Sequence, residues 1–191
     1  MGADYYFYLE VKINDRWVLT NKKVRARARD NVKGSVVIPS YWCGSRTYFG
    51  EAWDKLRDIG GAINVGGISK DLRIYLQKVY MNDFRSVEII SVPFSEIKNE
   101  LGDKKYDRVG FVKKSDLLSE EEIFEWLQVE EYEELDSEVK KAYEYHEWVD
   151  PYGWLRFFKM LVEHLEPDID EFNFHYNRDM TGSRLIGVMD Y

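Results

Sequence analysis

The sequence contains little cysteine and little histidine, and it has no long apolar run. Cys43 is the only cysteine among 191 residues, so the chain can form neither an intramolecular disulfide nor a zinc site built from several cysteines. No apolar stretch approaches the roughly 18 residues that a transmembrane helix requires. Residues 1–6 lack the basic and apolar regions of a secretory signal peptide. We therefore expect a cytoplasmic protein with no membrane partner.

Familiar catalytic motifs are also missing from the sequence. The histidines, His146, His164 and His175, are far apart and do not occur in a His-Glu-x-x-His spacing. The chain has neither a P-loop nor a Gly-x-Ser-x-Gly nucleophile elbow. Cys43 and Arg46 lack the longer spacing that a cysteine phosphatase loop requires. We therefore predict no catalytic residues, no metal site and no cofactor, and we expect a binding protein rather than an enzyme.

Acidic residues are concentrated in the second half of the chain. Residues 1–95 contain 15 Lys and Arg against 10 Asp and Glu, whereas residues 96–191 contain 12 against 25. Between residues 115 and 150, 14 carboxylates accompany only Lys140 and Lys141. Such a segment repels phosphate backbones and attracts basic surfaces, although a pair of solvated helix faces would have the same composition. We expect no direct nucleic-acid binding through this half. The predicted partner-binding residues are Glu120, Glu121, Glu130, Glu131, Glu133 and Glu134.

The start of the chain predicts a β-hairpin. Odd-numbered residues from Tyr5 to Ile13 are apolar or aromatic, and the even-numbered residues from Tyr6 to Lys12 form a more polar face. This alternation is typical of a half-buried strand. Asn14 and Asp15 favour a turn, after which residues 16–20 resume an extended pattern.

Apolar residues at helical spacing predict helices in the middle and late parts of the chain. Residues 48–59 are amphipathic and end at Gly60-Gly61, a typical glycine C-cap. A further helix is expected after Ser69. Asp150-Pro151 begins a long apolar stripe that we expect to end at Pro167.

The acidic segment is also expected to be helical. Ser119 and Glu122 match a capping box, which predicts that an acidic helix begins there. A second helix is expected from about residue 136 to residue 148. The chain from about residue 115 to residue 150 is therefore predicted to form an acidic helical segment.

Strand patterns near both ends suggest the fold class. Residues 86–92 and 107–113 have the composition of strands, and residues 171–176 and 184–189 suggest a terminal hairpin. Terminal hairpins with helices between them favour an α+β fold. We predict a single domain spanning residues 1–191, with an antiparallel sheet and four to five helices packed on it, on one face.

Several short segments carry a resemblance to a known group of proteins. The chain begins Met-Gly-Ala-Asp-Tyr-Tyr, and the similarity continues in residues 45–48, 110–118 and 184–191. These segments resemble small uncharacterised proteins of bacteriophages and prophages that begin Met-Gly-Cys-Asp-Ile-His. Ala3 and Tyr6 stand where that group has Cys and His. This difference weakens any metal role, because tyrosine does not replace a neutral imidazole ligand.

Aromatic residues make up 16% of the chain and suggest an alternative binding surface. Tyr and Trp are favoured at partly hydrated interfaces and at sites where bases stack on aromatic rings, although most such rings fill a core. Nearby arginines would supply guanidinium groups for phosphate. The predicted ligand-binding residues are Arg25, Arg27, Tyr41, Trp42, Arg46 and Tyr48. Arg46 is expected near a helix N-terminus, where it either binds an anion or pairs with Glu51 or Asp54.

These observations lead to two functional hypotheses. The first is a non-enzymatic phage or mobile-element protein that inhibits a host or bacterial defence system, in the manner of an anti-CRISPR protein, by binding a basic surface through its carboxylates. The second is a binder or processing enzyme for a small nucleotide that uses the aromatic and arginine surface.

Overall fold

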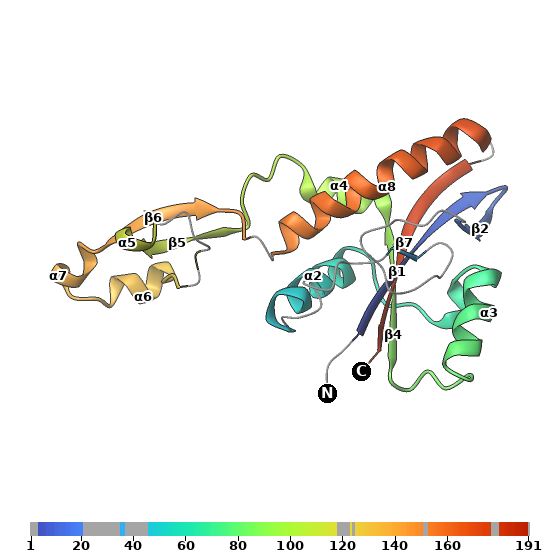
Figure 1. Ribbon diagram of the computed structural model, residues 1–191, viewed down its shortest axis with the longest axis horizontal. Coiled ribbons are helices and arrows are strands. Elements are labelled where there is room, and N and C mark those ends of the chain that lie inside the picture. Colours follow the sequence, from blue (N-terminus) through green and yellow to red (C-terminus); the bar gives the residue numbers. More distant parts are fainter. Residues whose placement is uncertain are drawn as a thin grey trace.

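The computed structural model describes residues 4–20, 35–36, 46–117, 123, 125–150, 153–176 and 180–190 (Figure 1). Its strands are β1 (Asp4–Ile13), β2 (Arg16–Leu19), β3 (Ser35–Val36), β4 (Val87–Pro93), β5 (Arg108–Lys113), β6 (Tyr143–Trp148) and β7 (Met180–Asp190). Its helices are α2 (Arg46–Ile59), the 3-10 helix η1 (Val65–Gly67), α3 (Lys70–Val79), α4 (Phe94–Leu101), α5 (Lys114–Leu117), α6 (Val129–Glu133), α7 (Ser137–Lys140) and α8 (Trp154–Tyr176). The α+β prediction is confirmed. Among the described helices, none is both long enough and apolar enough to cross a membrane.

The main sheet is antiparallel, and its two central strands come from opposite ends of the chain. Its order is β2-β1-β7-β4, and β3 also pairs with β1. The predicted N-terminal hairpin is confirmed, since β2 follows β1 through a turn in which Asn14 and Asp15 have φ values of 48° and 60°. Positive φ at both turn residues suits the twist of a two-residue hairpin. The C-terminal strand is also confirmed, but it pairs with β1 and β4 rather than with residues 171–176.

Helices cover both faces of this sheet, which corrects the prediction of helices on one face. Odd-numbered residues of β1 pack with α2, α4 and α8 in one apolar core. On the opposite face, Tyr8 joins Leu72 and Leu76 of α3 in a second core. The even-numbered face of β1 is therefore buried in part, and Tyr8 and Glu10 are inaccessible to solvent.

A buried ion pair fixes α3 against the sheet. Arg184 lies opposite Glu10 in the β1–β7 register and donates to its carboxylate at 2.6 and 2.9 Å. The other oxygen of Glu10 accepts the backbone N–H of Ser69, the N-cap of α3, at 2.8 Å. The Arg184 guanidinium also lies 3.9 Å from the centre of the Trp17 ring. The hydrogen bonds offset the cost of burying both charges and connect β1, β7 and α3, and the contact with Trp17 adds β2.

Helix α8 is longer than predicted. It passes through Pro167, which is exposed, and includes residues 171–176, which were expected to form a strand. Phe172 and Tyr176 are four residues apart and stack with their ring centres 6.1 Å apart. An aromatic pair four residues apart supports a helix. Aromatic and polar side chains also alternate along residues 171–176, as they would in a strand.

The acidic segment contains less helix than predicted. Residues 137–140 are helical, but the expected continuation to residue 148 is wrong, because residues 143–148 pair with β5 as strand β6. The proposed capping box at residues 119 and 122 lies outside the described residues. Leu127 forms a bridge with Phe111, so the chain is extended there rather than helical, and α6 begins only at Val129.

Candidate interaction surface

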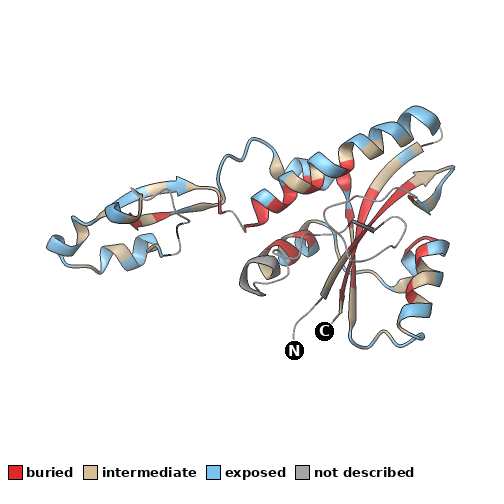
Figure 2. Cartoon of the chain, in the orientation of Figure 1, coloured by how far each residue is buried: buried red, intermediate tan, exposed pale blue. Residues whose placement is uncertain are grey.

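Strands β5 and β6, with α5, α6 and α7 between them, extend away from the rest of the molecule (Figure 1). We call residues 108–148 the arm and the remaining described residues the body. Buried residues are concentrated in the body, whereas the arm is largely exposed or half-buried (Figure 2). Val112 is the only buried hydrophobic side chain among the described residues of the arm.

One face of the arm sheet is held by stacked rings. Phe111 of β5 and Tyr132 of α6 stack in parallel with centroids 3.6 Å apart, and Tyr145 of β6 meets Phe111 edge-on at 5.7 Å. Lys140 lies over Tyr132 at 5.3 Å and bonds to the Glu133 carbonyl at 2.9 Å. Such aromatic pairs contribute about 0.5–1.5 kcal/mol each beyond the area they bury, so this stack fixes α6 and α7 on the sheet.

The opposite face of the arm carries a tryptophan pair. Trp126 meets Trp148 edge-on at 5.6 Å, and His146 stacks beside Trp148 at 6.0 Å. Gly110 lies beneath this pair, where a Cβ atom would come within 2.9 Å of the Trp126 ring and 2.8 Å of the Leu127 carbonyl oxygen. The close packing of the 126–127 segment on β5 therefore requires glycine at position 110.

The acidic residues predicted to bind a partner are brought together only in part. Four of them lie within or directly after α6, and all four are exposed: Glu130, Glu131, Glu133 and Glu134. Two of these, Glu131 and Glu133, also have partners within the arm. Glu131 accepts the Gln128 N–H at 2.8 Å in a capping box, and Glu133 pairs with Lys140. No cation of the described chain forms an ion pair with Glu130 or Glu134. The remaining predicted residues, Glu120 and Glu121, lie outside the described residues.

A second group of exposed residues, missed by the sequence analysis, surrounds Glu147. Tyr145 donates its hydroxyl to the Glu147 carboxylate at 3.1 Å, and Val109 lies directly opposite Glu147 in the strand register. Hydrogen bonding to this carboxylate raises the pKa of Tyr106 and of Tyr145, so both phenols stay protonated as donors. The helix predicted from about residue 136 to residue 148 would separate these side chains, whereas the strand places them on one face.

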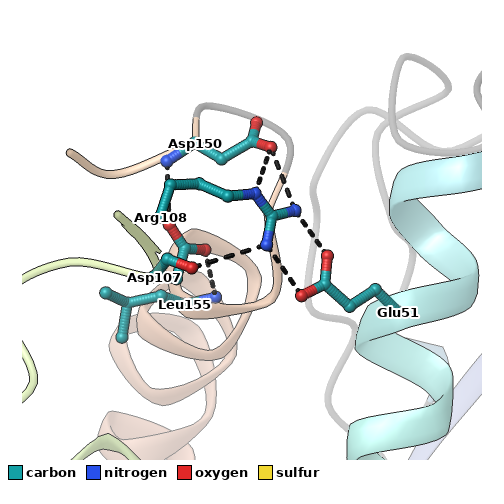
Figure 3. A network of polar contacts seen from close by, with 5 residues as sticks. All are labelled: Glu51, Asp107, Arg108, Asp150 and Leu155. Carbon is teal, nitrogen blue, oxygen red and sulfur yellow. Dashed lines mark hydrogen bonds and ion pairs between the residues drawn. The ribbon is translucent and has the colours of Figure 1, made fainter. Parts of the chain in front are cut away.

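Arg108 joins the arm to the body (Figure 3). Its guanidinium donates to both oxygens of Glu51 in α2, at 2.8 and 2.5 Å, and lies 3.2 Å from the Asp150 carboxylate. The hydrogen bonds with Glu51 and the surrounding carboxylates raise the pKa of Arg108. This contact could not be predicted from the sequence, because Glu51 and Arg108 are 57 positions apart along the chain.

Asp107 completes this junction by bonding to backbone groups. Its carboxylate accepts the N–H of Asp150 at 2.9 Å and the N–H of Leu155 in the first turn of α8 at 3.2 Å (Figure 3). Burial raises the pKa of Asp107, and these hydrogen bonds oppose the rise. A Cβ at Gly153 would lie 2.2 Å from the same carboxylate, so glycine is required beside it.

The alternative ligand surface is not assembled among the described residues. Its members Arg25, Arg27, Tyr41 and Trp42 lie outside them. Arg46 and Tyr48 lie in the first turn of α2, and their side chains are outside the described set. The two carboxylates expected to pair with Arg46 have other partners, since Glu51 binds Arg108 and Asp54 binds Arg57 at 2.7 Å.

Within the described part of the chain, no cluster of three or more His, Cys, Asp or Glu side chains is arranged to hold a metal ion. Comparison of the whole chain with protein-family models, curated proteins and solved structures finds no match.

Proposed function

We propose that the protein is a non-enzymatic interaction protein whose arm binds a basic surface on another protein. The observation that carries this proposal is the exposed pair of carboxylates, Glu130 and Glu134, on an extended arm that is anchored to a well-packed body. Carboxylates presented in this way attract a surface rich in Lys and Arg and repel nucleic acid.

The partner class that fits this chemistry is a protein that itself binds nucleic acid. Its basic groove would accept carboxylates in place of phosphates. Together with the resemblance to phage proteins, this supports inhibition of a host or bacterial defence system, such as an RNA-guided nuclease, as the biological role.

The proposal is tested by reversing the charges of Glu130 and Glu134, which form no ion pair with any cation of the described residues. In the variant E130K/E134K the helix cap at Glu131 and the Glu133–Lys140 pair remain, so the arm keeps its internal contacts. The matched control is D58K/E163K, which makes the same charge change at exposed positions of α2 and α8 in the body.

Tagged parent and variants are used to capture proteins from a bacterial lysate, and captured nucleases are assayed for inhibition. We expect E130K/E134K to lose the captured protein and its inhibition, and the control to keep both. Added salt should weaken binding of the parent. Capture of the same protein with equal yield by both variants would contradict the proposed role of the arm.

A further inference from the structure

The exposed face of the arm next to α6, together with Tyr106 two residues before β5, combines aromatic, apolar and acidic groups at one place. We call Tyr106, Val109, Tyr145 and Glu147 the Glu147 patch. Val109 and Tyr145 are 51% and 50% exposed, although both lie within paired strands. Phe111 touches both Tyr145 and Tyr132 of α6, so only one ring separates the patch from the acidic helix.

The patch holds its carboxylate in a defined position. The Tyr145 hydroxyl donates to one oxygen of Glu147, and Tyr106 interacts with the same carboxylate. No Lys or Arg of the described chain forms an ion pair with Glu147. A fixed carboxylate beside exposed rings differs from a general acidic surface, because it presents a flat aromatic face and an anion together.

This combination suits arginine better than lysine. A guanidinium is planar and weakly hydrated, stacks on aromatic rings, and donates two parallel hydrogen bonds to a carboxylate. An ammonium group is strongly hydrated and interacts as a point charge. The body contains the same arrangement internally, where Arg184 lies on the Trp17 ring and binds the Glu10 carboxylate.

We infer that the Glu147 patch is a recognition site for an arginine side chain on the basic surface of the partner protein. This inference rests on the proposed function and names the residue type that the arm selects. Charge complementarity with the nearby Glu130 and Glu134 brings the basic surface to the arm, and the patch then discriminates between its cations.

The test compares two labelled peptides of equal length and charge, in which glycine alternates with either arginine or lysine. Their dissociation constants are measured by fluorescence anisotropy for the parent protein. We expect the arginine peptide to bind roughly five- to tenfold more tightly, since stacking and a charge-assisted hydrogen bond each add a modest gain at an exposed site. Equal affinity for the two peptides would overturn the inference.

Variants locate the origin of this preference. Glu147→Gln and Tyr145→Ala should abolish it, whereas Tyr145→Phe, which keeps the ring, should keep part of it. The matched control is Tyr176→Ala, which removes an exposed ring from α8 and should leave the preference intact. A preference that survives both Glu147→Gln and Tyr145→Ala would overturn the inference, and melting curves identify any variant that fails to fold.

The same peptides separate this inference from the proposed function. If both peptides bind the parent equally and E130K/E134K weakens both, the arm binds basic surfaces without selecting arginine. In that case the inference fails and the proposed function stands. If neither peptide binds the parent at low salt, both fail.

Discussion

The body buries apolar side chains on both faces of its sheet, whereas the arm buries only Val112 among its described hydrophobic residues. Apolar burial stabilises the body at about 25 cal/mol for each Å² removed from water. In the arm, stacked rings and the junction at Arg108 replace such a core. A segment that gains little from burial can leave its side chains exposed, and this property suits a binding element.

The largest expected effect is the loss of a core ring in the body. Phe157→Ala in α8 should lower the free energy of unfolding by about 3–5 kcal/mol, because Phe157 is fully buried against Phe7. Urea denaturation measures this loss. Val112→Ala in the arm serves as the comparison and should destabilise the protein less. If the two changes cost the same, the contrast between body and arm is wrong.

Breaking the buried ion pair should have an effect of similar size. Arg184→Ala leaves the Glu10 carboxylate buried without its cation and should cost about 3–5 kcal/mol. The double variant Glu10→Leu/Arg184→Met should recover most of that stability in urea denaturation, because it leaves no unpaired charge. Equal losses for the single and double variants would show that the pair does not act as a unit.

A smaller and more local effect is expected at the junction. Arg108→Ala removes the contact with Glu51 and should cost about 1–3 kcal/mol, with faster trypsin cleavage in the arm than in the body. Arg57→Ala is the control, since Arg57 is exposed and its ion pairs with Asp54 at 2.7 Å and Glu88 at 3.7 Å should contribute at most about 1 kcal/mol each. Uniform acceleration of cleavage in both regions would argue against a junction specific to the arm.

The raised pKa of Asp107 predicts that the stability of the protein depends on pH. Burial raises its pKa above the ordinary value of 3.8, so the folded protein binds this proton more tightly than the unfolded chain does. The stability contributed by Asp107 is therefore complete below 3.8 and is lost as the pH rises through the raised pKa. Relative to Asp107→Asn, the parent should lose stability over this window in urea denaturation. A parent that instead gains stability relative to Asp107→Asn as the pH rises would contradict the assignment.

The smallest effect is expected from nucleotides, which test the alternative ligand surface. A bound nucleotide at 100 times its Kd would add about 2.7 kcal/mol of stability. Since the arm accounts for binding in our proposal, we expect no change in Tm with a nucleotide panel. A shift that Arg46→Ala removes would instead favour the aromatic and arginine surface.

The parts of the fold that depend on local pattern could be predicted from the sequence. Alternation in residues 5–13 and the Asn14-Asp15 turn indicate the first hairpin without reference to other segments. The burial of Glu10 could not be predicted in this way, because it depends on Ser69 and Arg184, which come from distant segments.

The contrast between local pattern and contacts with distant segments also explains which features of the arm could be predicted. Val139, Ala142, Tyr143 and His146 fit helical spacing, and pairing with β5 decides that residues 143–148 form a strand. The negative charge at positions 130 and 134 is evident from the sequence without knowledge of the fold. The grouping of Tyr106 with Glu147 and of Arg108 with Glu51 requires the folded chain.

The most direct test of the account is to locate where a basic ligand binds. Hydrogen–deuterium exchange is measured on the full chain with and without the arginine-containing peptide, at low salt. We predict added protection within residues 125–148, with little change in β1, β4 and β7. Protection confined to the body, with the arm unchanged, would contradict the claim that the arm is the binding element.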